Sequence, residues 1–517
     1  MMKEEKNNFI NFIKKSKYSI AFIVFFTLLA FGQRLLTTGF GIDNELYLLS
    51  IDKSEQWQWW FNLNRWGLVF LNKIFQMDLL SIYISNYLTV ITMVFYAIGF
   101  NYLIYMCMKD EWKSTFLKYQ FVFPILFLTN PIFAEQYNFL LQNFGVALGI
   151  FMIPLSLLLQ EIAQKMENKT HKILTYTLAI GLAIWSFGIY QSILLLYVAT
   201  VAIVYLLKVL NNNDNNWKFL LRQIGIFAIS AFGFIMISKQ LSQETSYLQM
   251  AWLKDSFGIC ILNIFYCVKS MIKSETIFYN IGYIVSIVIM LTTLFYYLRK
   301  RNFKIGLLIG ILGVLCAPLY IMIVTGVDQF KRTQFNYSFT VGFVILFGII
   351  LLSKKNLLLT TLKTTLIVFA IGLAYIQSYT CANLFQTAEI TYQTDFTFAN
   401  HIVSEIQKQN WFEEEKEYVL IFLGKHSVQE KFAYVEGEII GKSFFEFDYE
   451  YLYGVNSRAN AFLQLLGYYF NEPSQEQFDM AKKYVLENNI PAWPKENAIC
   501  LVNENTIIVR LSQEIEN

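Results

Sequence analysis

Long apolar runs, separated by short polar stretches, fill most of the chain up to about residue 380. As a helix, a run of about 20 apolar residues is long enough to cross the roughly 30 Å hydrocarbon core of a membrane. The pattern therefore predicts about eleven spanning helices, which begin near residues 18, 82, 119, 138, 173, 189, 219, 279, 305, 338 and 357. Pro124 and Pro131 are expected to shorten or bend the third of them.

The composition indicates a membrane environment for the chain. Of its 517 residues, 56% are hydrophobic, 17% aromatic and only 15% charged, which is too apolar for a soluble domain. The net charge of +3 gives no sign of a nucleic-acid partner. The lysine-rich start precedes "YSIAFIVFFTLLAFG" without a small-residue cleavage site, so we expect an uncleaved first span. These features predict a polytopic α-helical membrane protein.

Positive charge along the chain predicts its orientation. Lysine and arginine gather before the first span and in alternate loops, among them Lys165, Lys169 and Lys172 and the "RKRNFK" run. Because cytoplasmic loops carry the excess of positive charge, we expect a cytoplasmic amino terminus. The outer side then receives residues 38–80, the turns near 135 and 188, the loop 239–278, the segment near 330 and everything after about 380.

The composition changes after about residue 380. The apolar "YVLIFLG" has strand character, and Pro473 and Ser474 precede the helix-like "SQEQFDMAKKYVLENN". The closing "AICLVNENTIIVRLS" indicates two strands joined by an Asn-rich turn. We therefore predict a membrane domain, residues 1–380 with the outer loop 38–80, and a small extracytoplasmic α/β domain, residues 381–517.

Two carboxylates, Asp43 and Glu45 in "GIDNELYLL", follow the first apolar run on the outer side. A charge there is often only a solvated helix end. In extended backbone the two side chains would share one side, whereas in a helix they would diverge by about 200°. The tryptophan-rich "QWQWWFNLNRWG", which contains Arg65, predicts a helix in the membrane interface. This helix would hold the acids and Arg65 beside the headgroups, where a lipid-borne substrate would meet them.

Further polar residues of the outer turns are candidates for lining a cavity. Glu135 lies at one such turn, and Gln142, seven residues later, is expected on roughly the same helical face. Tyr190 and Gln191 in "SFGIYQS" form a hydrogen-bonding pair suited to a polyhydroxylated ligand. Each also has an ordinary interpretation, as a helix end or as interface residues.

Cations on the outer side depart from the inward bias of positive charge. "GVDQFKRTQF" carries Lys331 and Arg332, a pair that can hold a phosphate. The sequence has no Gly-rich phosphate loop and no metal-binding cluster. Outward acids and cations together predict sugar transfer from a lipid-phosphate donor, in which cations stabilise the departing phosphate and Asp43 takes the proton of an acceptor hydroxyl.

Several segments resemble the Gtr-type (serotype-converting, O-antigen-type) glucosyltransferases, polytopic membrane enzymes of the GT-C class. The resemblance rests on the order of the "GID-x-E" opening at residues 41–45, "NRWG", "PIFAEQ", "LQ", "GIYQS" and the arginine before "TQF". It extends to the closing "NIPAWPKENAICLVNENTIIVRL". Asn64 stands in "NRWG" where glycine is commoner, a departure that bears on how the donor fits.

The resemblance implies a GT-C-like fold and an inverting transfer of glucose, or a related hexose, from polyprenyl phosphate to a cell-surface polysaccharide, on the outer face of a bacterial cell membrane. It also implies that Asp43 is the base, with Glu45 as its partner. Some GT-C enzymes bind a divalent metal, but we recognise no ligand set for one and expect no cofactor. The other predicted site residues are Arg332, Arg65 and Lys331 for the donor phosphate, and Glu135, Gln142, Tyr190 and Gln191 for the sugar.

Two alternatives belong to other functional classes. A transporter or flippase of lipid-linked saccharide would also need cavity-lining glutamine, tyrosine and arginine, but its spans should form paired inverted halves. No such symmetry is visible, and an outer domain suits an enzyme that handles an acceptor. A catalytically inactive scaffold is the second alternative, and the intact Asp43 and Glu45 argue against it.

Overall fold

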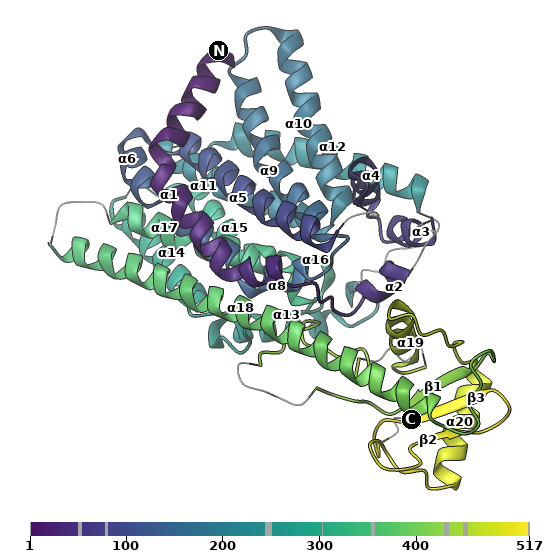
Figure 1. Cartoon of the computed structure of the whole chain (residues 1–517). Helices are drawn as coiled ribbons and strands as arrows, with labels where there is room; N and C mark the ends of the chain where they lie inside the picture. Colours follow the sequence, from purple (N-terminus) through teal and green to yellow (C-terminus); the bar gives the residue numbers. More distant parts are fainter. Residues whose placement is uncertain are drawn as a thin grey trace. The chain divides into compact units, whose positions relative to one another are not determined.

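The structure is a computed structural model that describes residues 2–49, 54–77, 81–212, 214–242, 251–301, 303–352, 357–428, 434–447 and 453–514. These residues are mostly helical, with one small sheet near the carboxyl terminus (Figure 1). The chain forms two compact units. The helical unit comprises Met1–Leu36 and Trp57–Ala382, and the α/β unit comprises Thr37–Gln56 and Asn383–Asn517.

Within the described residues, nine helices are long and apolar enough to cross a membrane. They are α1 (Met2–Leu36), α5 (Ile82–Cys107), α9 (Asn143–Gln164), α10 (Lys169–Ile189), α11 (Ser192–Asn212), α12 (Trp217–Leu241), α14 (Gly282–Arg299), the broken helix Ile305–Thr325 and α18 (Leu357–Gln407). The broken helix consists of α15 (Ile305–Cys316), the 3-10 turn η3 (Ala317–Leu319) and α16 (Tyr320–Thr325). This architecture agrees with a polytopic helical protein, and the number of spans stays a prediction.

Two of the predicted spans take another form. The segment near residue 119 is not one long helix but two short ones, α7 (Val122–Leu128) and α8 (Pro131–Tyr137). The Asn130 side chain caps α8 by accepting a hydrogen bond from the Ile132 amide, and Pro131 occupies its first turn. A helix cannot continue through this arrangement because proline lacks the N–H group that the preceding turn needs. The segment near 338 forms α17 (Phe335–Leu351), which has 17 residues.

These short helices form the interior of the helical unit. All residues of α7 and α8 are buried, as are the first sixteen residues of α17. α17 packs against α7 so closely that a Cβ atom on Gly342 would lie 2.7 Å from the Phe123 carbonyl oxygen. A helix that is apolar on every side lies either in a membrane or inside protein. Because the protein itself buries the first sixteen residues of α17, this helix need not match the thickness of a membrane.

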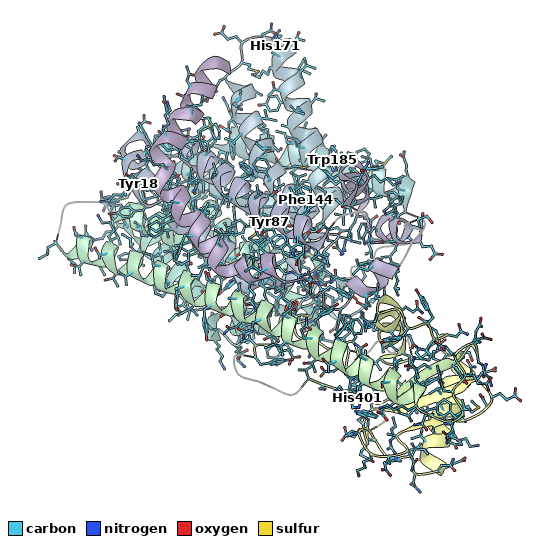
Figure 2. The ribbon with its side chains drawn as sticks, in the orientation of Figure 1. Tyr18, Tyr87, Phe144, His171, Trp185 and His401 are labelled. Atoms are coloured by element: carbon cyan, nitrogen blue, oxygen red, sulfur yellow. The ribbon has the colours of Figure 1, made fainter. Side chains whose placement is uncertain are left out.

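The predicted interfacial helix is divided in two. α3 (Ser54–Asn62) and α4 (Trp66–Phe75) are separated by a turn at residues 63–65. Trp60 is fully buried, whereas Trp59 is 49% exposed. Trp185 of α10, labelled in Figure 2, donates a hydrogen bond from Nε1 to the Gly67 carbonyl oxygen at 3.1 Å. Part of the tryptophan cluster thus packs inside the protein, and its place in a membrane interface stays a prediction.

The other helices of this unit connect the long ones. They are α6 (Asp110–Tyr119), η2 (Ala251–Leu253), α13 (Phe257–Lys273) and η4 (Lys331–Thr333). Parts of two predicted outer loops, residues 50–53 and 78–80 of 38–80 and residues 243–250 of 239–278, lie outside the described residues.

The α/β unit contains a three-stranded sheet of β1 (Val419–Leu423), β2 (Ile499–Leu501) and β3 (Thr506–Arg510) in the order β1-β3-β2. β1 pairs in parallel with β3, with Val419 opposite Thr506, and β2 pairs antiparallel with β3. Helix α20 (Gln475–Glu487) begins at a capping box formed by Ser474 and Gln477. Its Ala481 and Val485 pack on Ile421 and Ile508 of the sheet. The predicted strands and the predicted helix after Ser474 are confirmed.

Two features of the α/β unit were not predicted. α18 continues for 51 residues to Gln407, although the composition changes near residue 380. Residues 37–56, which we assigned to an outer loop of the membrane domain, belong to the α/β unit. This unit therefore combines segments from both ends of the chain, together with the short helices α2 (Asn44–Leu49) and α19 (Asn456–Leu465).

Candidate active site

A cavity of about 220 Å³ lies in the helical unit, between α11, α12, α16 and the turns beside α4 and η4. Four predicted site residues line it: Arg65, Tyr190, Gln191 and Arg332. Its walls are largely apolar and include Leu194, Leu195, Phe234, Ile321 and Val324. Drug-sized ligands usually occupy roughly 300–1,000 Å³, so this cavity suits a headgroup and the adjoining chain rather than a whole lipid.

The turn that carries Arg65 depends on Asn64. Asn64 has a φ of 59°, in the left-handed region that glycine and asparagine adopt most readily. This turn therefore accepts asparagine at the position where we expected glycine to be commoner. The Gln191 side-chain amide donates a hydrogen bond to the Leu63 carbonyl oxygen and fixes the start of the turn.

Arg65 has only neutral partners among the described residues. Its Nη1 donates to Gln142 Oε1 at 2.9 Å, and its guanidinium carbon lies 4.9 Å from the centre of the Tyr190 ring. Its Nε is buried without a hydrogen-bond partner. A buried donor without a partner is unfavourable, and a positive charge beside it favours an anionic acceptor. The arrangement around Arg65 is therefore suited to an anion.

The second group of predicted cations divides between two roles. The Arg332 guanidinium lies over the Phe330 ring, 4.1 Å from its centre, and lines the cavity. Lys331 does not line the cavity, and its Nζ pairs with Asp328 Oδ2 at 2.5 Å. Arg332 is consequently better placed than Lys331 to meet a ligand in this cavity.

Glu135 and Gln142 do not line the cavity. The interpretation that they share one helical face is wrong, because α8 ends at Tyr137 and Gln142 immediately precedes α9. Glu135 is fully buried in α8, which packs against η4. Gln142 contacts Arg65 instead and orients its guanidinium.

The two predicted acids lie together in the α/β unit. Asp43 occupies a left-handed turn with a φ of 72°, immediately before α2, in which Glu45 is the second residue. Neither an extended segment nor a continuous helix describes this geometry. Arg458 of α19 joins them, donating from Nη2 to Asp43 Oδ1 and from Nη1 to Glu45 Oε1, each at 2.6 Å.

Arg458 is the site residue that the sequence analysis missed. It lies in "NSRANAFL", where Asn456, Arg458 and Asn460 alternate with small or polar residues ahead of apolar ones, and all three are buried. A charged residue in a helix of the predicted soluble domain has no distinctive local signal. The local signal that could have been used is the spacing of Asn456 and Asn460, which are four residues apart. This spacing puts both side-chain amides on one face of a helix.

Burial dominates the electrostatics of Glu45. It raises the pKa of Glu45 from 4.5 to about 7; the charge of Arg458 opposes this rise, and the charge of Asp43 adds to it. Glu45 Oε2 has no hydrogen-bond partner among the described residues. The Asp43 side chain is 23% exposed, whereas that of Glu45 is fully buried. Asp43 is therefore the carboxylate that a substrate can reach.

Among the described residues, no group of three or more histidine, cysteine, aspartate or glutamate side chains lies together in a way that could hold a metal ion. Asp43 and Glu45 supply two carboxylates, and both contact Arg458.

Comparison with known proteins gives one match. A family model described as "Glucosyl transferase GtrII" matches residues 34–353, which is more than half of the chain. The matched range includes Asp43, Glu45 and Arg65 as well as Arg332, and it ends before α18. No curated protein and no solved structure matches the chain.

Proposed function

Because the chain belongs to the GtrII glucosyltransferase family, we propose that it moves glucose, or a related hexose, from a polyprenyl-phosphate donor to a cell-surface polysaccharide. The protein is a glycosyltransferase with several helices apolar enough for a membrane, and the transporter alternative is not favoured. We propose that transfer takes place on the outer face of a bacterial cell membrane, with the amino terminus in the cytoplasm. The distribution of lysine and arginine supports this orientation.

The observation that carries this proposal is the Arg65 cavity. It combines cationic side chains, Arg65 and Arg332, with apolar walls. A lipid phosphate presents the complementary chemistry, an anion attached to a hydrocarbon chain. The described partners of Arg65 are neutral, so its charge is available to the donor phosphate. Guanidinium groups also stabilise the negative charge that develops on a departing phosphate.

Asp43 is the proposed base. In our proposal the Asp43 carboxylate takes the proton of an acceptor hydroxyl while its oxygen forms the new bond to the anomeric carbon. The bond from that carbon to the phosphate oxygen breaks, and polyprenyl phosphate leaves with the electron pair. Attack on the face opposite the leaving group inverts the anomeric configuration. Glu45 is buried and acts as the partner of Asp43 rather than as the base.

The remaining predicted residues keep proposed roles. Tyr190 and Gln191 line the cavity. In our proposal they contact the sugar or its phosphate. Gln142 acts through Arg65, which it orients. Glu135 stays a prediction for the shape of the sugar pocket. We assign no residue to a metal or cofactor, and we expect transfer to continue when divalent ions are removed with a chelator.

The proposal is tested by sugar transfer in detergent. Purified protein receives polyprenyl-phosphate-glucose and crude bacterial surface polysaccharide, and wild type is compared with Asp43→Asn. Asp479→Asn, an exposed position of α20, is the matched control. Asp43→Asn should lower kcat by about 10²- to 10⁴-fold with donor binding retained, and the control should match wild type. If wild type moves the lipid-linked sugar across vesicles but transfers none, the transporter interpretation replaces this one.

A further inference from the structure

Arg458 is almost completely enclosed between the two acids of the "GIDNE" segment. Its side chain is 2% exposed and that of Glu45 is fully buried, whereas that of Asp43 is 23% exposed. Each carboxylate takes one guanidinium nitrogen at 2.6 Å. Because Asp43 alone of the three is accessible, Arg458 acts on any substrate through Asp43.

Two asparagines fix the helix that carries Arg458. The Asn456 side chain accepts a hydrogen bond from the Phe422 amide at 2.7 Å and donates to the Phe422 carbonyl oxygen at 2.9 Å. Asn456 thereby forms hydrogen bonds with the edge of β1 that does not pair with β3. Asn460, one helical turn later, donates to the Leu420 carbonyl oxygen at 3.2 Å. Residues two apart on a helix diverge by about 200°, so Arg458 points away from β1.

Aromatic contacts hold the acidic segment against the same face of α19. Phe462 lies one turn after Arg458 on this face, and its ring centre is 6.2 Å from that of Phe40 and 4.3 Å from that of Phe444. The buried Asp395 accepts a hydrogen bond from the Phe444 amide at 2.9 Å and fixes that residue in turn. α19 therefore contacts the segment at Phe40 and again at the two acids.

The charges around Arg458 exclude a direct role in binding an anion. Its two outer nitrogens already contact carboxylates, in the forked geometry for which a guanidinium is suited. The charged groups that act on Glu45 are Arg458 from α19 and Asp43 from the turn before α2. Without Arg458, the two neighbouring carboxylates would lose the cation that both contact.

We propose that Arg458 is a positioning residue for Asp43: it holds the Asp43 carboxylate in a fixed orientation, and Glu45 anchors the guanidinium. The inference rests on the proposed function, in which Asp43 is the base. The family match ends at residue 353 and assigns no role to Arg458. On this view α19 provides the cation that both acids contact.

The test compares Arg458→Gln, Arg458→Lys and the control Arg510→Gln in the full-length protein. Arg510 is a second buried arginine of the α/β unit, and its side chain contacts carbonyl oxygens of Ile490, Ser512 and Gln513 rather than acids. For each protein, kcat, the donor KM, the dependence of the rate on pH and the unfolding temperature are measured.

Arg458→Gln should lower kcat at pH 7 by about 10- to 100-fold, because the Asp43 carboxylate loses the group that orients it. The donor KM should change by less than about twofold, because Arg458 is not among the residues proposed to hold the donor phosphate. Arg458→Lys restores the charge without the fork, so kcat should recover only in part. Arg510→Gln should lower the unfolding temperature and leave kcat unchanged.

The outcomes separate this inference from the proposed function. If wild type transfers sugar and folded Arg458→Gln keeps the wild-type kcat, the positioning role is wrong and the glycosyltransferase proposal stands. If wild type transfers no sugar from the lipid donor, the proposed function fails, and the role of Asp43 as base fails with it. If Arg458→Gln does not fold, Arg458→Lys decides: the folded lysine variant should have a lower kcat and an unchanged donor KM, because lysine lacks the fork that contacts both carboxylates, and a wild-type kcat overturns the inference.

Discussion

Arg458 in the α/β unit is buried and Arg65 in the helical unit is partly buried, and the partners of the two arginines are opposite in kind. Arg458 contacts two carboxylates, whereas the described partners of Arg65 are an amide oxygen and an aromatic ring. A guanidinium compensated by carboxylates orients them and has little capacity for a further anion. A guanidinium held by neutral groups keeps its charge for a ligand. The partners of each arginine, rather than its residue type, indicate its role.

Burial has different consequences for the two regions. Removing one member of a buried ion pair leaves an uncompensated charge, which is strongly destabilising. Arg65 is partly buried, and its described partners are neutral. An anionic donor would therefore supply the negative charge that its guanidinium lacks. We therefore expect changes in the acidic cluster to alter stability and pH dependence, and changes near Arg65 to alter donor affinity.

The largest expected effect concerns the stability of the acidic cluster against pH. The pKa of Glu45 is about 7 in the folded protein, against 4.5 for an ordinary glutamate. Between these values the folded state binds more protons than the unfolded state, so the free energy of unfolding falls as the pH rises through this window. The total fall is up to about 3 kcal/mol. Unfolding temperatures measured by tryptophan fluorescence between pH 4.5 and 8 would report it.

Glu45→Gln is the control for this prediction, because it keeps the shape of the side chain and does not titrate. Its unfolding temperature should fall less than that of wild type over the same window. Parallel pH curves for the two proteins would contradict the assignment to Glu45.

The next effect concerns the donor site. Arg65→Gln should raise the donor KM by about 10- to 100-fold, because a hydrogen bond to a charged group contributes about 1.5–3 kcal/mol. Titration of polyprenyl-phosphate-glucose at fixed acceptor measures the change. An unchanged donor KM with a raised acceptor KM would reverse the assignment of this cavity.

A smaller effect tests how α4 holds the Arg65 turn. A Cβ atom on Gly67 would lie 2.7 Å from the Trp185 carbonyl oxygen and 2.8 Å from the Gly188 carbonyl carbon, and these backbone atoms cannot rotate away. Gly67→Ala should therefore destabilise the protein by about 1–2 kcal/mol. Gly181→Ala in α10 is the matched control, because no atom lies within 4 Å of its added Cβ. Equal unfolding temperatures for the two variants would show that α4 and α10 separate easily.

The smallest effect is expected at Lys331. Lys331 does not line the cavity. Its charge is compensated by Asp328, whose side chain is 45% exposed. Lys331→Gln should change the donor KM by less than about threefold, because partly exposed ion pairs contribute roughly 0–1 kcal/mol. A change as large as that of Arg65→Gln would place Lys331 in the donor site after all.

The sequence predicts local structure where the pattern repeats over a short distance. The helix after Ser474 and the strands of "YVLIFLG" and "AICLVNENTIIVRLS" are confirmed, because capping residues and apolar runs act over a few neighbours. The break at Pro131 was predicted as a bend, but the two fully buried short helices around it were not. Hydropathy alone does not distinguish a helix in lipid from one enclosed by other helices, as α17 illustrates.

The candidate site was predictable only in part, for the same reason. Residue type and position beside an apolar run identified Asp43, Glu45, Arg65 and Arg332. The helical face assigned to Glu135 and Gln142 was wrong, because α8 ends at Tyr137, between them, and α9 begins only after Gln142. Arg458 escaped notice because it is 413 residues from Glu45, and no local pattern reports a contact at that distance.

The sequence by itself determined the class of protein, the apolar helices, the carboxyl-terminal strands and the presence of acids and cations beside the apolar runs. Each of these follows from composition or from the short periods of helices and strands. Only the tertiary structure decided that residues 37–56 join the α/β unit, that Arg458 pairs with both Asp43 and Glu45, and that Arg65 faces neutral partners. Packing between distant segments sets which charges are compensated, and that compensation separates a positioning arginine from one available to a ligand.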